Sequence, residues 1–210
     1  MATKHNWAEE IKPLLKKYKN KKHPLEYSNM YQLLVMVVLS AQTTDNLVND
    51  IAPALFKEFP NMAALANAKP ETLDPLIRKV RGSLKKGAWL IRIAQLLKTD
   101  KNIPLTMAEL TKLPGIGRKS ANVIMREAGV KAEGVIVDLH VLRVAPRLGI
   151  AKGEEAKDIE KQIMEKVDPK DWGQAGMAIS FLGRDTCRPT NPKHEDCVLA
   201  KVCDYFMDAR

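Results

Sequence analysis

The sequence predicts an all-helical protein, and three features of the chain carry that prediction. Residues 30–39 form a long apolar segment, and apolar residues recur at helical spacing over 88–97 and on one side of 154–167. Residues that favour a helix start precede such segments, as Asn29 does before the first of them. Alternating strand patterns are scarce, and the β-prone run 135–137 is short. We therefore expect helices joined by loops, in one domain or in two small ones.

The individual helices follow from the same signals. Ser28 or Asn29 would cap the first helix, and Asp45 would cap the second, in which Pro53 introduces a kink. Pro70 followed by an acidic residue is typical of the first turn of a helix. The expected long helices cover residues 30–39, 46–59, 70–81, 88–97, 139–148 and 154–167.

A glycine-rich turn joins two further helices. A helix that starts at Thr106 is interrupted by Pro114, Gly115 and Gly117, and helical spacing resumes over 121–128. Glycines allow close approach to a backbone, and the N–H groups at a helix start favour an anion such as phosphate. Taken alone, such a glycine pair more often marks a hinge between packed helices.

Two residues near this turn have the chemistry needed to cleave an N-glycosidic bond. Lys119 lies in the first turn of the second helix, where the helix dipole and partial burial would lower its pKa from ~10.4 and favour an amine nucleophile. Asp138 follows three apolar residues, and its carboxylate would stabilise the cation that develops as a base leaves its sugar. Taken singly, Lys119 fits a surface lysine, and Asp138 fits the N-cap of the 139–148 helix.

Several motifs in order resemble the endonuclease III family of DNA glycosylases. Residues 113–123, LPGIGRKSANV, and 137–141, VDLHV, look like the helix-hairpin-helix and catalytic-aspartate segments of that family. Residues 39–45, LSAQTTD, match its loop near the flipped base, and the C-terminal cysteines match its iron–sulfur segment. Only about the first twenty residues carry no motif, so the resemblance covers nearly the whole chain.

The resemblance implies a fold of two helical domains with a DNA cleft between them. A helical barrel domain with the helix-hairpin-helix would cover 24–132. A discontinuous domain with the cluster loop would combine 1–23 with 133–210.

The resemblance also implies an activity, that of a bifunctional DNA glycosylase and AP lyase acting on oxidised pyrimidines in duplex DNA. Lys119 would attack the deoxyribose C1′, displace the base and form a Schiff base, and β-elimination would then nick the strand. Asp138 would be the catalytic carboxylate. Monofunctional relatives lack a lysine at the position of Lys119. The residues expected to contact DNA are Gln42, Ser83, Leu84, Gly115, Ile116, Gly117, Arg118, Arg188 and Lys193.

The chain departs from the family pattern at positions that concern lesion choice. In the family, the residue at Gln42 helps to fill the gap left by the flipped nucleotide. In the family, a bulky side chain that is inserted into the DNA stack as a wedge usually follows the glycine at the position of Gly82. Here that residue is Ser83. Either Leu84 serves as a shifted wedge, or the base opposite the lesion is held less tightly. The family's lysine is absent at Gly87. Leu139 replaces a usual threonine, and we expect it to pack into the core.

The C-terminal cysteines suggest a metal centre whose ligands are not all cysteine. Cys187, His194, Cys197 and Cys203 have the spacing C-x6-H-x2-C-x5-C, which by itself fits a Cys3His zinc site. The family pattern has a cysteine at position 194 and holds a [4Fe–4S] cluster. We rank a histidine-ligated cluster first, because imidazole can ligate cluster iron. A cluster held by three cysteines, or zinc, ranks second, and loss of the metal ranks third.

Composition agrees with a DNA partner without proving one. The formal net charge is +9, which suits a polyanion but also fits a generic basic protein. No apolar stretch reaches the length of a membrane span, and the N-terminus lacks a signal-peptide core. Three cysteines near one end do not indicate a secreted disulfide framework. We therefore expect a cytoplasmic monomer that binds double-stranded DNA and no membrane.

Two alternatives to the main functional hypothesis stay open at this point. Changes at Ser83, Leu84 and Leu139 are compatible with a related glycosylase for mismatched or alkylated bases, or mainly for AP sites. A non-catalytic binder of damaged DNA is the second alternative, against which the intact pair of Lys119 and Asp138 weighs.

Overall fold

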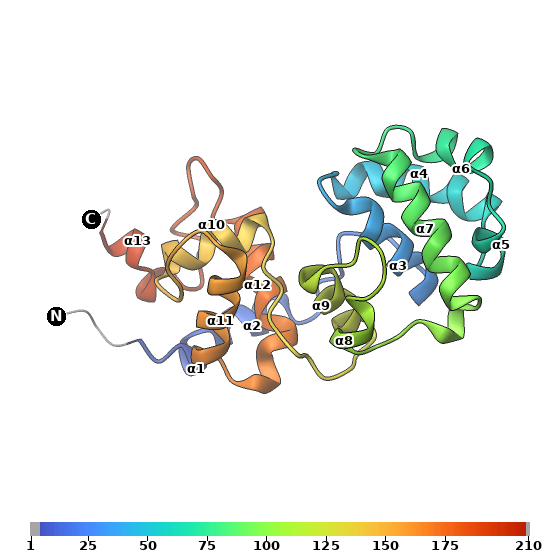
Figure 1. Ribbon diagram of the computed structural model, residues 1–210. Coiled ribbons are helices and arrows are strands. Elements are labelled where there is room, and N and C mark those ends of the chain that lie inside the picture. The colour runs from blue at the N-terminus through green and yellow to red at the C-terminus, as the bar shows by residue number, and fades with distance from the viewer. Residues whose placement is uncertain (1–4, 209–210) are drawn as a thin grey trace. The chain divides into compact units, whose positions relative to one another are not determined.

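The computed structural model describes residues 5–208, and within this range it contains helices and loops but no strand (Figure 1). The prediction of an all-helical fold is confirmed. The β-prone run 135–137 is buried and has no regular secondary structure, and it pairs with no other described segment in a ladder. Its neighbour is a helix, as described below. None of the described helices has the length and apolar character needed to cross a membrane.

By its internal contacts the chain divides into two compact units. One unit is formed by 22–130, and the described residues 5–21 and 131–208 form the other. The boundaries lie within two residues of those expected for two domains. That the units act as domains with DNA bound between them stays a prediction.

The 22–130 unit is built around one largely apolar helix. Seven consecutive residues from Leu33 to Leu39 in α3 are buried, as expected for a central helix that is apolar on all sides. Asn29 caps this helix by accepting a hydrogen bond of 2.9 Å from the backbone N–H of Gln32. The helices of this unit are α3 (Met30–Ser40), α4 (Asp45–Glu58), α5 (Met62–Ala66), α6 (Pro70–Ile77), α7 (Ser83–Leu97), the 3-10 turn Asp100–Asn102, α8 (Met107–Leu110) and α9 (Arg118–Glu127).

Three helix boundaries in this unit differ from those expected. The cap of α4 is Thr44 and not Asp45, because the Thr44 hydroxyl accepts from the N–H of Leu47 at 3.4 Å. Helix α6 ends at Ile77 and not at 81, where the chain turns to bury Val80. Helix α7 begins at 83 and not at 88. Its first turn shows no apolar period, because its leucine, Leu84, is exposed and its buried residue is Lys86.

The other unit is organised by α12, a helix whose small residues permit close packing. A Cβ atom on Gly176 would lie 2.3 Å from the backbone oxygen of Ile136, and one on Gly183 would lie 2.9 Å from Cβ of His140. Helix α12 therefore packs directly against the 135–137 segment and α10. The helices of this unit are α1 (Trp7–Glu10), α2 (Lys12–Tyr18), α10 (Leu139–Leu148), α11 (Ala156–Lys166), α12 (Trp172–Asp185), α13 (Asp204–Met207) and the 3-10 turns Pro169–Asp171 and Ala200–Val202.

Candidate active site and metal centre

The expected helix-hairpin-helix turn is present between α8 and α9. Gly115 has φ +76°, in the left-handed region that favours glycine, and a Cβ atom there would lie 2.3 Å from Cε3 of Trp89. Ile116 is buried in the hairpin, with its N–H bonded to the carbonyl of Leu113 at 3.2 Å. The turn is thus fixed by the ring of Trp89 from α7, a contact that sequence reasoning did not find.

The N-terminus of α9 is open on the side of its first turn. Gly117 is the N-cap residue, no side chain caps this end, and a Cβ atom on Gly117 would meet nothing within 4 Å. The cap residue thus places no side chain over the helix start, and an anion such as a phosphate could approach it there.

Lys119 is the second residue of α9 and is exposed, as is Arg118 beside it. The expectation of partial burial for Lys119 was wrong. The buried face of α9 is formed by residues from 121 onwards, and Lys119 points away from that face. What the fold supplies is an accessible amine next to an uncapped helix start.

Asp138 is the N-cap of α10 and is held by four hydrogen-bonding or charged groups. Its Oδ1 accepts from the backbone N–H groups of His140 and Val141, each at 2.9 Å. Its Oδ2 accepts from the hydroxyl of Ser180 at 2.6 Å and lies 4.0 Å from Nη2 of Arg184. Its side chain is 16% exposed, so the carboxylate of Asp138 is held in one orientation, largely shielded from solvent and still accessible.

The close packing of α12 explains why these partners reach Asp138. Gly176, Ser180 and Gly183 lie on the face of α12 that contacts the 135–137 segment and α10. Ser180 is fully buried, and its only signal in the sequence is a hydroxyl within the otherwise apolar run 175–183. Sequence reasoning missed both Ser180 and Arg184.

Two candidate DNA-contacting segments of the 22–130 unit are tied together by a buried lysine. Gln42 is exposed in the loop after α3 and has φ +56°, an unusual value for a residue with a side chain. Ser83 and Leu84 begin α7, and Leu84 is 71% exposed, as a wedge would be. Lys86 on the same turn is 5% exposed and bonds to the loop that carries Gln42. Burial, and to a smaller extent Arg81, lowers the pKa of Lys86.

Leu139, the residue after the candidate catalytic carboxylate, is 79% exposed. The expectation that it packs into the core was wrong. As the first residue of α10 it lies where the helix meets solvent, and the buried face of α10 begins at Val141. An exposed leucine therefore stands directly beside Asp138.

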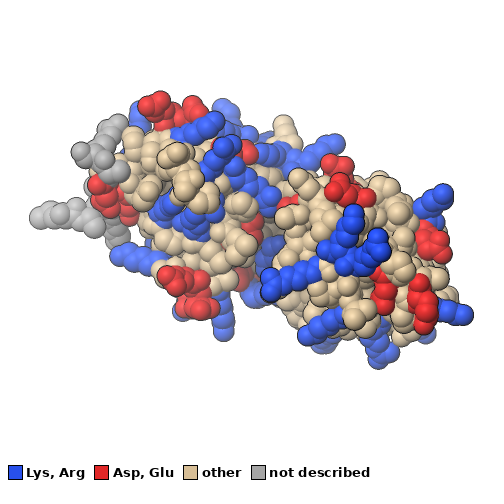
Figure 2. Space-filling model, turned by 90° about the horizontal axis from the view of Figure 1, so that it is seen from above, with Lys and Arg blue, Asp and Glu red and all other residues tan. Residues whose placement is uncertain are grey.

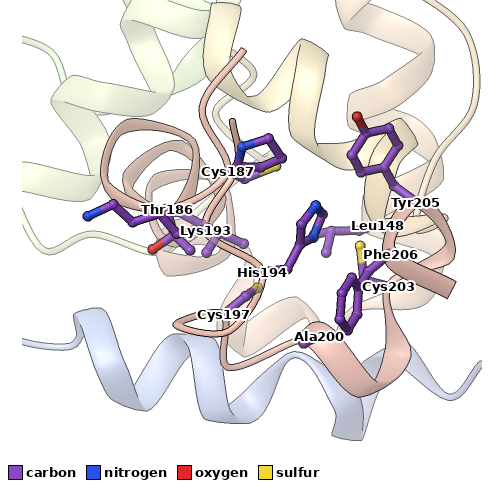
Figure 3. A pocket seen from close by; sticks show the side chains of 12 residues that line it. Leu148, Thr186, Cys187, Lys193, His194, Cys197, Ala200, Cys203, Tyr205 and Phe206 are labelled. Atoms are coloured by element: carbon purple, nitrogen blue, oxygen red, sulfur yellow. The ribbon is translucent and has the colours of Figure 1, made fainter. Parts of the chain in front are cut away.

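The three cysteines and His194 line a single pocket at the C-terminal end of the chain. Figure 3 shows Cys187, Cys197 and Cys203 on three sides of the imidazole of His194. Burial raises the pKa of the Cys197 and Cys203 thiols. The His194 ring stacks on Phe206 with centroids 4.7 Å apart. Among residues 5–208, no three His, Cys, Asp or Glu side chains lie close enough together to hold a single metal ion.

Arg147 on α10 holds the loop that carries the first of these cysteines. Its guanidinium donates to the carbonyl oxygens of Arg188 at 2.8 Å and Pro189 at 3.1 Å, and it lies 3.6 Å from Sγ of Cys187. Arg188 and Lys193 are themselves exposed on this loop, as residues that contact DNA must be. Figure 2 shows Lys and Arg side chains on the visible surface of both units, with Asp and Glu in smaller groups.

The chain is similar to known proteins over most of its length. Residues 35–169 match the HhH-GPD superfamily of base excision DNA repair proteins. The chain is 37% identical over 207 residues to endonuclease III of Synechocystis sp., covering 97% of this chain and 94% of the relative. The chain belongs to the endonuclease III family. Endonuclease III of Bacillus subtilis is 35% identical, with coverage of 85% of this chain and 83% of the relative.

Solved structures of the family extend the agreement to the fold. The structure of a trapped endonuclease III–DNA covalent intermediate matches with a TM-score of 0.84 and 30% identity, over 95% of this chain and 94% of that chain. A non-covalent endonuclease III–DNA complex also matches with a TM-score of 0.84, at 31% identity. The fold and family expected from the motifs are thus confirmed, whereas the roles of single residues stay predictions.

Proposed function

We propose that this endonuclease III homologue removes oxidised pyrimidines from duplex DNA and cleaves the resulting AP site through a Schiff base. The observation that carries the proposal is Lys119, an exposed amine in the first turn of an uncapped helix. The N–H groups at the start of α9 would hold a DNA phosphate, and the glycines would admit the DNA backbone close to the helix. Gly115, Ile116, Gly117 and Arg118 would form this phosphate contact.

In the proposed reaction, the neutral amine of Lys119 attacks C1′ of the damaged nucleotide. The C1′–N bond breaks, and the base leaves with the bonding electron pair and takes up a proton. The carboxylate of Asp138 stabilises the positive charge that develops on the sugar. The lysine nitrogen gives up a proton, and the C1′–O4′ bond of the resulting aminal breaks as O4′ takes up a proton, so that C1′ and the nitrogen form a protonated Schiff base. This Schiff base makes the C2′ hydrogens acidic. Loss of one such proton expels the 3′ phosphate and nicks the strand.

Asp138 suits its role because its orientation is fixed before DNA binds. Both N–H bonds to Oδ1 and the Ser180 bond to Oδ2 restrain the carboxylate, so little reorganisation is needed as charge develops. Asp138 and Lys119 belong to different units of the chain. The proposal therefore requires both units to contact the same nucleotide.

Borohydride trapping tests the proposal. Wild type and Lys119→Ala would be incubated with duplexes carrying thymine glycol, an AP site or no lesion. We expect a covalent adduct on both damaged duplexes that disappears in Lys119→Ala, while DNA affinity changes little. An adduct that persists in the variant would show that another amine is the nucleophile. No adduct with wild type on any duplex would favour a non-catalytic binder of damaged DNA.

An altered lesion range is a second candidate within the same chemistry. Leu139 is exposed beside Asp138 where the family has threonine, and Ser83 stands where the family has a bulky wedge. A wild-type adduct on the AP site alone would favour an enzyme for other bases or mainly for AP sites. A panel of mismatched and alkylated bases would then identify the substrate.

We further propose that Cys187, Cys197 and Cys203, with His194 as the fourth ligand, hold a [4Fe–4S] cluster. A single zinc ion needs four ligands within about 2.3 Å of one point. The side chains surround one pocket but do not converge on such a point, which favours a group several ångströms across. When bound, the cluster would hold the loop of Arg188 and Lys193 in place and take no part in the reaction.

Visible absorption together with iron and zinc analysis tests the cluster. We expect a yellow-brown protein containing iron, and His194→Ala should lose the fourth ligand and release iron more readily on exposure to air. A colourless protein with stoichiometric zinc would contradict the cluster. His194→Ala with unchanged absorption and iron retention would favour ligation by the three cysteines alone.

The relatives reported above are bacterial repair enzymes, and we expect this chain likewise to act on double-stranded DNA in the cytoplasm, with the nucleoid. We expect it to act as a monomer.

A further inference from the structure

The first turn of α7 and the loop after α3 are joined by one side chain, Lys86. Its Nζ donates to the carbonyl oxygen of Leu39 at 2.8 Å, to the carbonyl oxygen of Ala41, and to Oγ1 of Thr43 at 3.3 Å. These three acceptors match the three N–H donors of an ammonium group. The acceptors lie before and after Gln42 in the chain, so Lys86 holds the loop from both sides of that residue.

The local electrostatics and backbone geometry explain why a buried cation is tolerated at this point. Leu39 is in the last turn of α3, where the unpaired carbonyls and the negative end of the helix dipole favour a positive charge. The loop itself is strained, because Gln42 has φ +56°. Such a conformation persists only when its surroundings enforce it, and the bonds of Lys86 supply that restraint.

The same turn of α7 carries the candidate wedge. The N–H of Lys86 bonds to the carbonyl of Gly82 at 3.0 Å, and this closes the turn that presents Ser83 and Leu84. The Leu84 side chain is 71% exposed and Gln42 is exposed, whereas Lys86 between them is buried. Lys86 is therefore too buried to contact DNA itself, but it fixes the loop that carries Gln42 and the turn that carries Leu84.

We propose that Lys86 is a positioning residue that locks Gln42 and Leu84 into one rigid unit, so that both enter the DNA stack together when a damaged nucleotide is extruded. The inference rests on the proposed function. Extrusion leaves a gap in the damaged strand and deprives the opposite base of its partner. Two probes held at a fixed spacing fill it without a further ordering cost at the moment of insertion.

The test uses Lys86→Met, which keeps the length of the side chain and removes its donors. Lys101→Met is the matched control, because it removes the same charge from an exposed position beyond the other end of α7. We expect Lys86→Met to slow single-turnover release of thymine glycol at least about tenfold, since small misplacements reduce rates strongly. The affinity for undamaged duplex should stay within about twofold of the control.

A double-mutant design separates positioning from general loss of structure. If Lys86 acts through both probes, Lys86→Met should add little to the defect of a Gln42→Ala, Leu84→Ala variant. A full additional loss in that background would overturn the proposal. The fluorescence of 2-aminopurine opposite the lesion supplies a second readout. Its increase on binding should be reduced in Lys86→Met and retained in Lys101→Met.

Thr43→Val provides a second test of the inference if Lys86→Met does not fold. This variant removes one acceptor of the three and leaves the lysine in place. We expect an intermediate loss of base release and of the fluorescence change. Wild-type rates and fluorescence in a folded Lys86→Met or Thr43→Val protein would overturn the inference. Failure of the proposed function is distinguishable, because wild type itself would then form no Lys119-dependent adduct.

Discussion

The hydroxyl of Ser180 on α12 donates a hydrogen bond of 2.6 Å to Oδ2 of Asp138, the residue that caps α10. The two residues are 42 positions apart in the chain, and they meet because α12 lies with its small residues against the 135–137 segment. The carboxylate that we assign to base release is thus oriented by a buried side chain that does not contact DNA.

Ser180→Ala should slow base release about tenfold while the affinity for lesion-containing DNA changes little, because Oδ2 of Asp138 loses its restraint. Single-turnover kinetics on a thymine-glycol duplex measures the effect. Ser180→Cys, which keeps the size and supplies a weak donor, should lie between wild type and the alanine variant. Equal rates of base release for all three proteins would show that Ser180 does not position Asp138.

Asp138→Asn separates the two roles of this residue. Asparagine is as good an N-cap as aspartate, so the free energy of unfolding, measured by thermal denaturation, should change by less than about 1 kcal/mol. The charge that stabilises the developing cation is lost, and base release should slow by about a hundredfold or more. Nicking of a preformed AP site should be partly retained. Loss of both steps to the same extent would assign Asp138 to folding and not to base release.

Gly115→Ala and Gly117→Ala test the hairpin as a pair. At Gly115 a methyl group would meet the ring of Trp89 and the backbone would be strained, so we expect a loss of about 1–3 kcal/mol in unfolding free energy. At Gly117 the methyl group would meet no protein atom within 4 Å. Gly117→Ala should therefore unfold like wild type yet bind DNA more weakly. Chemical denaturation measures the stability of the two variants, and DNA titration measures their affinity. Equal losses of stability in Gly115→Ala and Gly117→Ala would contradict the prediction.

His23 makes stability depend on pH. Its burial lowers its pKa from 6.5 to about 4, against the opposing effect of the acids Glu127 and Asp45 and with smaller lowering contributions from Lys119 and Arg126. The unfolded chain therefore binds a proton at a higher pH than the folded chain. The stability linked to this group is complete above pH 6.5 and falls as the pH drops toward 4, by about 2 kcal/mol at pH 5.

The control for this prediction is His23→Asn, because the amide oxygen can accept the bond that Nδ1 of His23 accepts from the N–H of Leu25. Denaturation curves between pH 7 and 5 should show a smaller slope in the variant than in wild type. Parallel curves would show that other groups cause the pH dependence.

The sequence alone determined those features that depend on neighbouring residues. Helix α10 was expected at 139–148 and is found there, and the break before α9 follows from Gly115 and Gly117. The N-cap at Asp138 is also a local feature, because a carboxylate bonds to N–H groups two and three residues further on. The separated motifs, taken in order, identified the family.

Only the tertiary structure decided how these features are supported and exposed. Ser180 reaches Asp138, Lys86 caps α3, and Trp89 fixes Gly115 because helices distant in the chain pack together. No local pattern encodes such contacts, since helical spacing reports which face is apolar but not which partner covers it. For the same reason the exposure of Leu139 could not be foreseen. A leucine in a sequence predicts burial, and whether a helix end is covered depends on the packing of the whole unit.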